Sequence, residues 1–348
     1  MKFYLTMRKE IRLPSPYLFS YIRRGRFSPP PTLLSYGQGY IGSSRLTDGQ
    51  GTNYGEGTAT LNTAEKTLTL KDVTLTDSIG IYAEGEFTVI VEGNCTIGSE
   101  SAPLTTSGIY AIDVTNLHIK MAEKSTLDVY NEEGNNIFSS GDLIVSAQGT
   151  LKAAVEGYPS LYAEKNLTLK SGVTADIESA GHGLCVNQGE VLVDGAKVDI
   201  NAGGCGIFAN YFYDENTEEE FFSSVILRNS DLTITTEYMQ GVYAGGNVTV
   251  DDTRLTVTVT DKTVDEELGS EGFTVYSDGK ITISGANTVI ETDDASGISG
   301  DQVEITGGTL NLKSVQDALY GYNGLVVSGG KIDAESTEGS ALEPILVS

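Results

Sequence analysis

A short motif repeats along this chain of 348 residues, and the repeat limits the possible folds more than any other feature. Each copy has an aliphatic residue, usually followed by an aromatic and a small one, as in GIYA, SLYA and GVYA. The aliphatic anchors are Ile81, Ile109, Ile137, Leu161, Leu184, Ile207, Val242, Val275, Ile298, Leu319 and Leu342. Their base spacing of about 23 residues predicts a stack of repeated coils.

Short alternating runs such as KTLTL, DLTIT and KITIS predict that each coil is made of strands, with Gly, Asn and Asp at the turns. A period of about 23 residues has room for three short strands and three turns, and no helical stripe accompanies it. We therefore expect an all-β fold, a single-stranded right-handed parallel β-helix of about eleven coils over residues 46–348. Acidic inserts at 211–222 and 261–272 lengthen two of the steps.

Residues 1–45 do not share the repeat and have a net positive charge, whereas the rest of the chain is acidic. They hold 8 Lys and Arg against the single Glu10, whereas the remainder holds 14 basic and 47 acidic residues. We expect this segment to be disordered or mis-annotated, because charged residues and Pro14 interrupt any export signal. The acidic body argues against nucleic acid as a partner. Membrane insertion is not expected, since no apolar run approaches the ~20 residues of a membrane helix.

Between the anchor and the small residue lies a position that alternation places on the outer surface, and it is aromatic in eight of eleven copies. Aromatic rings stack on sugars, while carboxylates and amides bind sugar hydroxyls. The candidate sugar-binding residues are Tyr82, Tyr110, Tyr162, Tyr243, Tyr276 and Tyr320, with Glu84 and Glu164 two positions further on. The same column could instead stabilise the coils through ring stacking alone.

The coils GIYAEGEFTVIVEGNCTIG and DDASGISGDQVEITGGTLNLKS resemble bacterial parallel β-helix surface proteins of the carbohydrate-binding-domain type, found in clostridia and other gut Firmicutes. The resemblance covers roughly Gly55 to Ser348. It implies a secreted or cell-surface location and calcium-dependent, non-catalytic binding of an acidic polysaccharide such as polygalacturonate. Its acidic positions correspond here to Asp278, Asp293, Asp294, Asp301 and Asp317, which it implies as calcium ligands. Such Asp and Gly pairs are also ordinary turn residues.

Parallel β-helices also include polysaccharide lyases and hydrolases, so catalysis needs a test. The pieces G-H-G at 181–183 and D-D at 251–252 and 293–294 resemble polygalacturonase motifs, but their order is reversed and no R-I-K follows. After residue 45 the only arginines are Arg228 and Arg254. We therefore expect a non-catalytic carbohydrate-binding module. The first alternative is a structural stalk or adhesin segment, and the second is a polysaccharide lyase or hydrolase.

Overall fold

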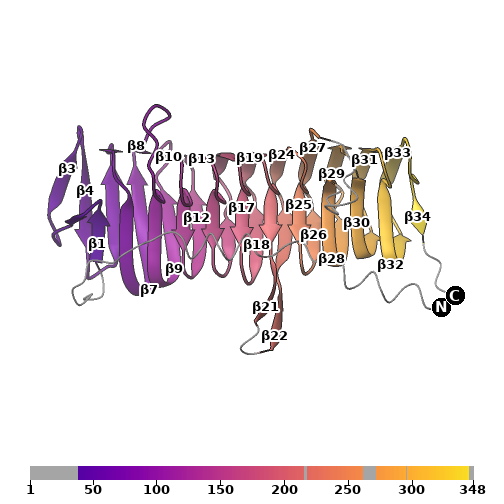
Figure 1. Cartoon of the computed structure of the whole chain (residues 1–348), viewed down its shortest axis with the longest axis horizontal. Coiled ribbons are helices and arrows are strands. Elements are labelled where there is room, and N and C mark those ends of the chain that lie inside the picture. The colour runs from indigo at the N-terminus through magenta and orange to yellow at the C-terminus, as the bar shows by residue number, and fades with distance from the viewer. Residues whose placement is uncertain (1–37, 215–217, 262–271, 295, 345–348) are drawn as a thin grey trace.

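The computed structural model describes residues 38–344 except 215–217, 262–271 and 295, and the regular elements of these residues are all strands (Figure 1). They form a 21-stranded sheet, here called sheet A, an 11-stranded sheet, called sheet B, and a two-stranded hairpin. Figure 1 shows the strands stacked along one long axis. The prediction of an all-β fold is confirmed, although sheet A is mixed rather than purely parallel.

A typical coil contributes two strands to sheet A and one to sheet B. In one such coil β11 (Ile137–Ser139) and β12 (Asp142–Ala147) lie in sheet A, and β13 (Thr150–Val155) lies in sheet B. Each pairs in parallel with the corresponding strand of the next coil. This arrangement is consistent with the predicted solenoid.

In some coils one long strand takes the place of the two short strands of sheet A. The other strands of sheet A that follow the repeat are β5 (Thr67–Lys71), β7 (Ile79–Glu92), β9 (Ile109–Met121), β14 (Leu161–Ala163), β15 (Leu167–Leu169), β17 (Leu184–Val186), β18 (Glu190–Asp194), β20 (Ile207–Ala209), β23 (Ser224–Arg228), β25 (Val242–Ala244), β26 (Val248–Asp251), β28 (Phe273–Ser284), β30 (Ser296–Ile305), β32 (Leu319–Val327) and β34 (Glu343–Pro344). The other strands of sheet B are β6 (Thr74–Leu75), β8 (Asn94–Ile97), β10 (Thr126–Asn131), β16 (Thr174–Ser179), β19 (Lys197–Ala202), β24 (Asp231–Thr236), β27 (Arg254–Val259), β29 (Val289–Asp293), β31 (Thr309–Ser314) and β33 (Lys331–Ser336).

One continuous apolar cluster fills the space between the sheets. The anchors from Ile109 to Leu319 are all buried and face one another from coil to coil. Each buried Leu, Ile or Val side chain stabilises the fold by roughly 1.5–3 kcal/mol. Because every coil supplies the same inward columns, the core continues along the whole stack.

The first anchor is wrong by two residues. Ile79, not Ile81, lies opposite Ile109, so Gly80 lies opposite Tyr110 and Tyr82 opposite Ile112. Either register keeps apolar residues inside, because Ile79 and Ile81 point the same way. Glycine at position 80 fits this register, because an added Cβ atom would lie 2.6 Å from the Cζ atom of Tyr110.

Antiparallel strands cover the start of the stack, a feature that the repeat does not predict. β1 (Gln38–Ile41) pairs antiparallel with β7 and also with β2 (Ser44–Arg45). β4 (Gly57–Asn62) pairs antiparallel with both β3 (Gly51–Tyr54) and β5. These strands satisfy backbone groups that the first coils would otherwise leave open at an edge.

The first acidic insert forms a hairpin of β21 (Tyr211–Asp214) and β22 (Glu219–Phe222), which projects from the stack in Figure 1. Most of the second insert, at 261–272, lies outside the described residues, as do residues 1–37 of the basic N-terminal segment. Within the described part of the chain, no helix is long and apolar enough to cross a membrane.

Candidate functional site

The predicted ring ladder is largely buried. Only 9% of Tyr82, 3% of Tyr162 and 7% of Tyr243 is exposed, and Tyr110, Tyr276 and Tyr320 are half-buried. The prediction of an open aromatic surface is therefore wrong for Tyr82, Tyr162 and Tyr243. Binding of sugars by the six as a set is not supported by their exposure.

The rings pack on one another instead. Centroids lie 5.6 Å apart for Phe138 and Tyr162, 5.0 Å for Phe208 and Tyr243, and 5.9 Å for Tyr243 and Tyr276, and each pair is nearly parallel. With Cys185, Cys205 and Met239 they form a second apolar cluster on the outer side of sheet A. Burial raises the pKa of Tyr162 and of Tyr243. This packing fits the structural alternative, in which the column stabilises the coils.

His182 extends this stack where its own coil has Cys185 in place of a ring. The imidazole lies 4.4 Å from the ring of Phe208, and its Nδ1 accepts a hydrogen bond from the backbone N–H of Cys205 at 2.9 Å. Loss of water around the ring lowers the pKa of His182 to about 4. The G-H-G piece therefore supplies packing and a turn contact, and its imidazole is held neutral by the fold.

The two candidate glutamates differ. Glu164 accepts hydrogen bonds from the Tyr162 hydroxyl at 3.3 Å and from the Asn187 amide at 3.0 Å, and Asn187 in turn accepts one from Asn210 at 3.0 Å. Glu84 is exposed, and its backbone carbonyl accepts a hydrogen bond from the Lys66 ammonium at 2.7 Å. Glu164 thus belongs to a polar ladder that joins three coils.

The five aspartates implied as calcium ligands lie in two separate places. Asp278 and Asp301 lie at irregular points of β28 and β30 in sheet A, whereas Asp293, Asp294 and Asp317 lie at or beyond the ends of sheet B strands. Among the residues that the structure describes, no group of three or more His, Cys, Asp or Glu side chains could hold a metal ion.

Two of these carboxylates accept hydrogen bonds from neighbouring coils or from nearby side chains. Asp278 accepts hydrogen bonds from the hydroxyls of Tyr243 at 3.0 Å and Tyr276 at 3.2 Å. The Asp317 carboxylate accepts the backbone N–H of Ser340 at 2.7 Å. Calcium takes six to eight oxygen ligands, so the described carboxylates do not fit one calcium site.

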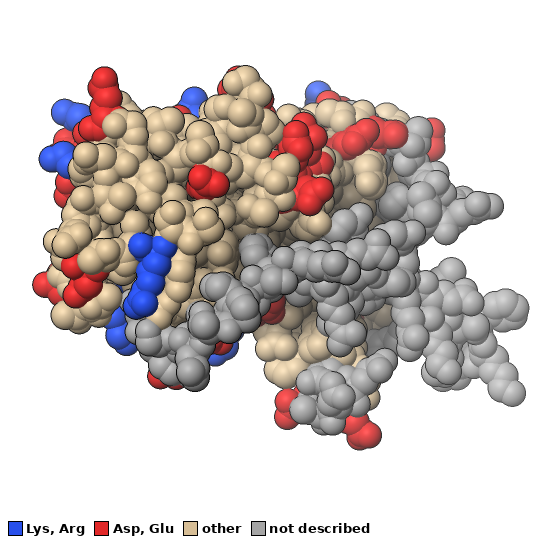
Figure 2. Space-filling view, turned by 60° about the vertical axis from the view of Figure 1, so that its left-hand side comes forward, with Lys and Arg blue, Asp and Glu red and all other residues tan. Residues whose placement is uncertain are grey.

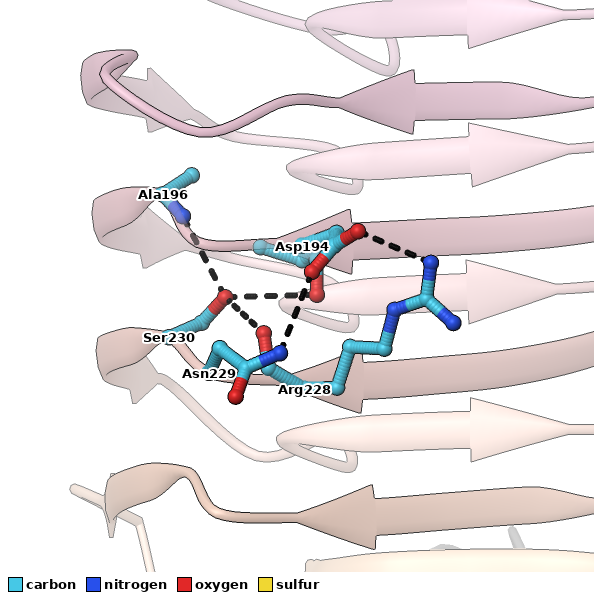
Figure 3. Close-up of polar contacts among 6 residues, drawn as sticks. Asp194, Ala196, Arg228, Asn229 and Ser230 are labelled. Carbon is cyan, nitrogen blue, oxygen red and sulfur yellow. Dashed lines mark hydrogen bonds and ion pairs between the residues drawn. The ribbon is translucent and has the colours of Figure 1, made fainter.

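The arginines of the repeat region connect neighbouring coils. Arg228 donates to Asp194 at 2.8 Å, and Asn229 donates to the other oxygen of that carboxylate at 3.4 Å (Figure 3). The hydrogen bond from Arg228 lowers the pKa of Asp194. Arg254 forms the same kind of ion pair with Glu291 at 2.8 Å. Neither arginine is thus positioned as the base of a lyase.

The backbone beside the Arg228 pair is fixed by a serine. Ser230 donates its hydroxyl to the carbonyl oxygens of Arg228 at 2.7 Å and Val193 at 3.2 Å, and accepts the N–H of Ala196 at 3.3 Å (Figure 3). These contacts hold the turns of two coils together.

A groove of about 770 Å³ lies on the outer side of sheet B, near the ends of five neighbouring strands from β10 to β24. We call it the sheet B groove. Its floor has one outward residue from each strand, and the strand pairing places them in a single row: Tyr130, Ala154, Glu178, Asn201 and Thr235. With strands about 4.8 Å apart, this row is about 19 Å long.

The groove combines one ring with polar groups. Turn residues Glu156, Glu237 and Thr260 line its side, and the Tyr130 ring lies at one end of the row. The turns of neighbouring coils pack closely at Gly203, where an added Cβ atom would lie 2.5 Å from the Ala180 carbonyl oxygen. A linear polymer lying along the groove would meet one outward side chain at every strand.

These groove residues were not among those selected from the sequence. Each floor residue precedes an anchor by six or seven positions, so the repeat could have aligned them. Nothing in that alignment shows that the row is hollowed, because the groove depends on how the turns pack beside it.

Exposed rings also occur on the β21–β22 hairpin. Tyr211, Tyr213 and Phe222 are each exposed by 39% or more, and the Tyr211 hydroxyl donates to Glu220 at 3.0 Å. The hairpin therefore offers a smaller second surface with aromatic and acidic groups.

A family model described as "Carbohydrate-binding domain-containing protein" matches residues 56–338, which is more than half of the chain. No curated protein and no solved structure matches.

Proposed function

Because the chain belongs to the carbohydrate-binding domain-containing family, we propose that the sheet B groove is its polysaccharide-binding site and that it binds without catalysis. The observation that carries this proposal is the row of five outward residues in register across five strands. Three neighbouring polar side chains, with a ring at the far end of the row, suit an extended sugar chain.

The binding interactions follow from the floor residues. The Tyr130 ring can stack on one sugar, while the amide of Asn201 and the hydroxyl of Thr235 can exchange hydrogen bonds with sugar hydroxyls. Glu178, at the centre of the row, accepts hydrogen bonds. The proposed role is non-catalytic, in line with the family and with the structural roles of His182 and the arginines.

Affinity electrophoresis of the full chain tests the site. Gels contain xylan, chitosan, pectin, polygalacturonate or no polysaccharide, and the variants are Tyr130→Ala and Asn201→Ala, with Asn311→Ala as the control. Asn311 is exposed on sheet B but lies outside the groove. We expect retardation by at least one polysaccharide, weakened by both groove variants and unchanged in the control. Retardation that both groove variants retain in full would refute the groove as the site.

Calcium-assisted binding of an acidic polysaccharide is a second, finer proposal that rests on the family resemblance. It needs the polysaccharide to supply oxygen ligands, because the described aspartates do not converge on one site. The same gels with calcium and with EDTA test it. Retardation by polygalacturonate only with calcium would support it, and equal retardation in EDTA would refute it.

We also propose that the module acts outside the cell, on a secreted or surface protein, where polysaccharides are found. The coils are inferred to wind as a right-handed parallel β-helix, because parallel crossovers are right-handed in about 98% of cases. The structural stalk or adhesin remains the alternative function. The ring stack and the cross-coil ion pairs favour it, and unchanged mobility in every gel would support it.

A further inference from the structure

The charged residues that line the sheet B groove are all acidic. They are Glu100, Glu156, Glu178 and Glu237, and all four are exposed. No Lys or Arg is among the described residues that line it. A ligand in the groove is therefore surrounded by carboxylates whose negative charge no described lining residue neutralises.

The next outward column of sheet B does not cancel this charge. It places Lys152 between Asp128 and Asp176, and Asp199 follows Asp176. Burial raises the pKa of Tyr130, and the nearby carboxylates of Asp128 and other acidic residues raise it further. Both observations indicate a negative potential along the groove.

We propose that the sheet B groove selects polysaccharides that carry free, protonated amino groups, such as polymers of glucosamine, over their neutral and acidic counterparts. This inference rests on the proposed function and names the ligand class of that site. Hydrogen bonds between ammonium and carboxylate groups are roughly twice as strong as neutral ones. A polyuronate would instead place carboxylates beside carboxylates, which disfavours binding.

Glu178 is the central residue of this selection. Its neighbours in the row are Ala154 and Asn201, which are smaller, so an amino group on the bound chain can approach the carboxylate. Glu156 and Glu237 approach from the turns at the side of the groove. An amino sugar chain can thus pair with carboxylates on two sides.

General attraction must be separated from selection, because the chain has a net charge of −26. On the face shown in Figure 2, acidic side chains gather along the upper edge right of centre, and basic ones lie mainly towards the left end. A cationic polymer is attracted to such a surface even without a site. The test therefore needs a control glutamate outside the groove.

The experiment measures dissociation constants by calorimetry at about pH 6, where amines are protonated and most carboxylates are ionised. The ligands are an oligomer of glucosamine, its N-acetylated counterpart and an oligogalacturonate of equal length. The groove variant is Glu178→Gln and the control is Glu65→Gln, an exposed residue near the start of the stack. Tyr130→Ala reports on the groove itself.

We expect the glucosamine oligomer to bind at least about tenfold more tightly than the N-acetylated one. Glu178→Gln should weaken glucosamine binding about three- to tenfold more than it weakens binding of the N-acetylated oligomer, and Glu65→Gln should change neither. Equal affinity for the two oligomers, tighter binding of oligogalacturonate, or equal losses in Glu178→Gln and Glu65→Gln would overturn the inference. If Tyr130→Ala leaves binding of every oligomer unchanged, the proposed site itself fails.

Discussion

The pH dependence of stability tests the structural role assigned to His182. Its pKa is about 4 in the folded protein and 6.5 in the unfolded chain. The unfolded state therefore binds the proton more readily, and stability is lost as the pH falls from about 6.5 towards 4. Proton linkage gives a loss of about 2 kcal/mol by pH 5, about 3 kcal/mol at pH 4 and at most about 3.4 kcal/mol at lower pH.

The assay is urea unfolding of the full chain at several pH values, compared with His182→Phe. This variant keeps a ring beside Phe208 but cannot titrate. Other groups, including the many carboxylates, affect both proteins alike, so the difference between the two curves isolates His182. A difference that stays constant between pH 7 and pH 4.5 would refute a neutral, desolvated His182.

Three further predictions concern buried polar groups, register and the ring stack. Asn136 is fully buried and donates to two backbone carbonyls. Asn136→Ala should therefore lower the free energy of unfolding in urea by about 2–4 kcal/mol, whereas the exposed control Asn311→Ala should lower it by less than about 0.5 kcal/mol. Gly80→Val should overlap the ring of Tyr110 and cost about 1–3 kcal/mol; an unchanged unfolding midpoint would contradict the register assigned to β7. Tyr243→Phe should lower stability by about 1 kcal/mol without changing polysaccharide retardation, and a loss of retardation would return the ring column to the binding site.

Much of the architecture could be predicted because every coil must place apolar residues at the same inward positions as its neighbours. A coil buries its apolar face only against the coils beside it, so the anchor column must repeat in the sequence. The nine anchors from Ile109 to Leu319 follow this rule and are all buried. Ile81 is out of register because a shift of two residues keeps the same face inside, and alternation cannot distinguish the two registers. The last predicted anchor, Leu342, is 50% exposed.

The functional surface was harder to predict for a related reason. Alternation states which side of a strand a residue occupies, but not what packs on that side. Tyr162 and Tyr243 do lie outside sheet A, yet Cys205 and Met239 from other turns pack with them. The carboxylates near Asp278 and Asp317 are likewise engaged by groups from neighbouring coils.

The sequence by itself determined the period, the strand content and the inward columns, because these depend on local alternation and on contacts between like positions. Only the tertiary structure decided that the ring column is a second core and that the row from Tyr130 to Thr235 forms the floor of a groove. Exposure and concavity depend on turns and side chains from several coils at once, and no single repeat contains that information.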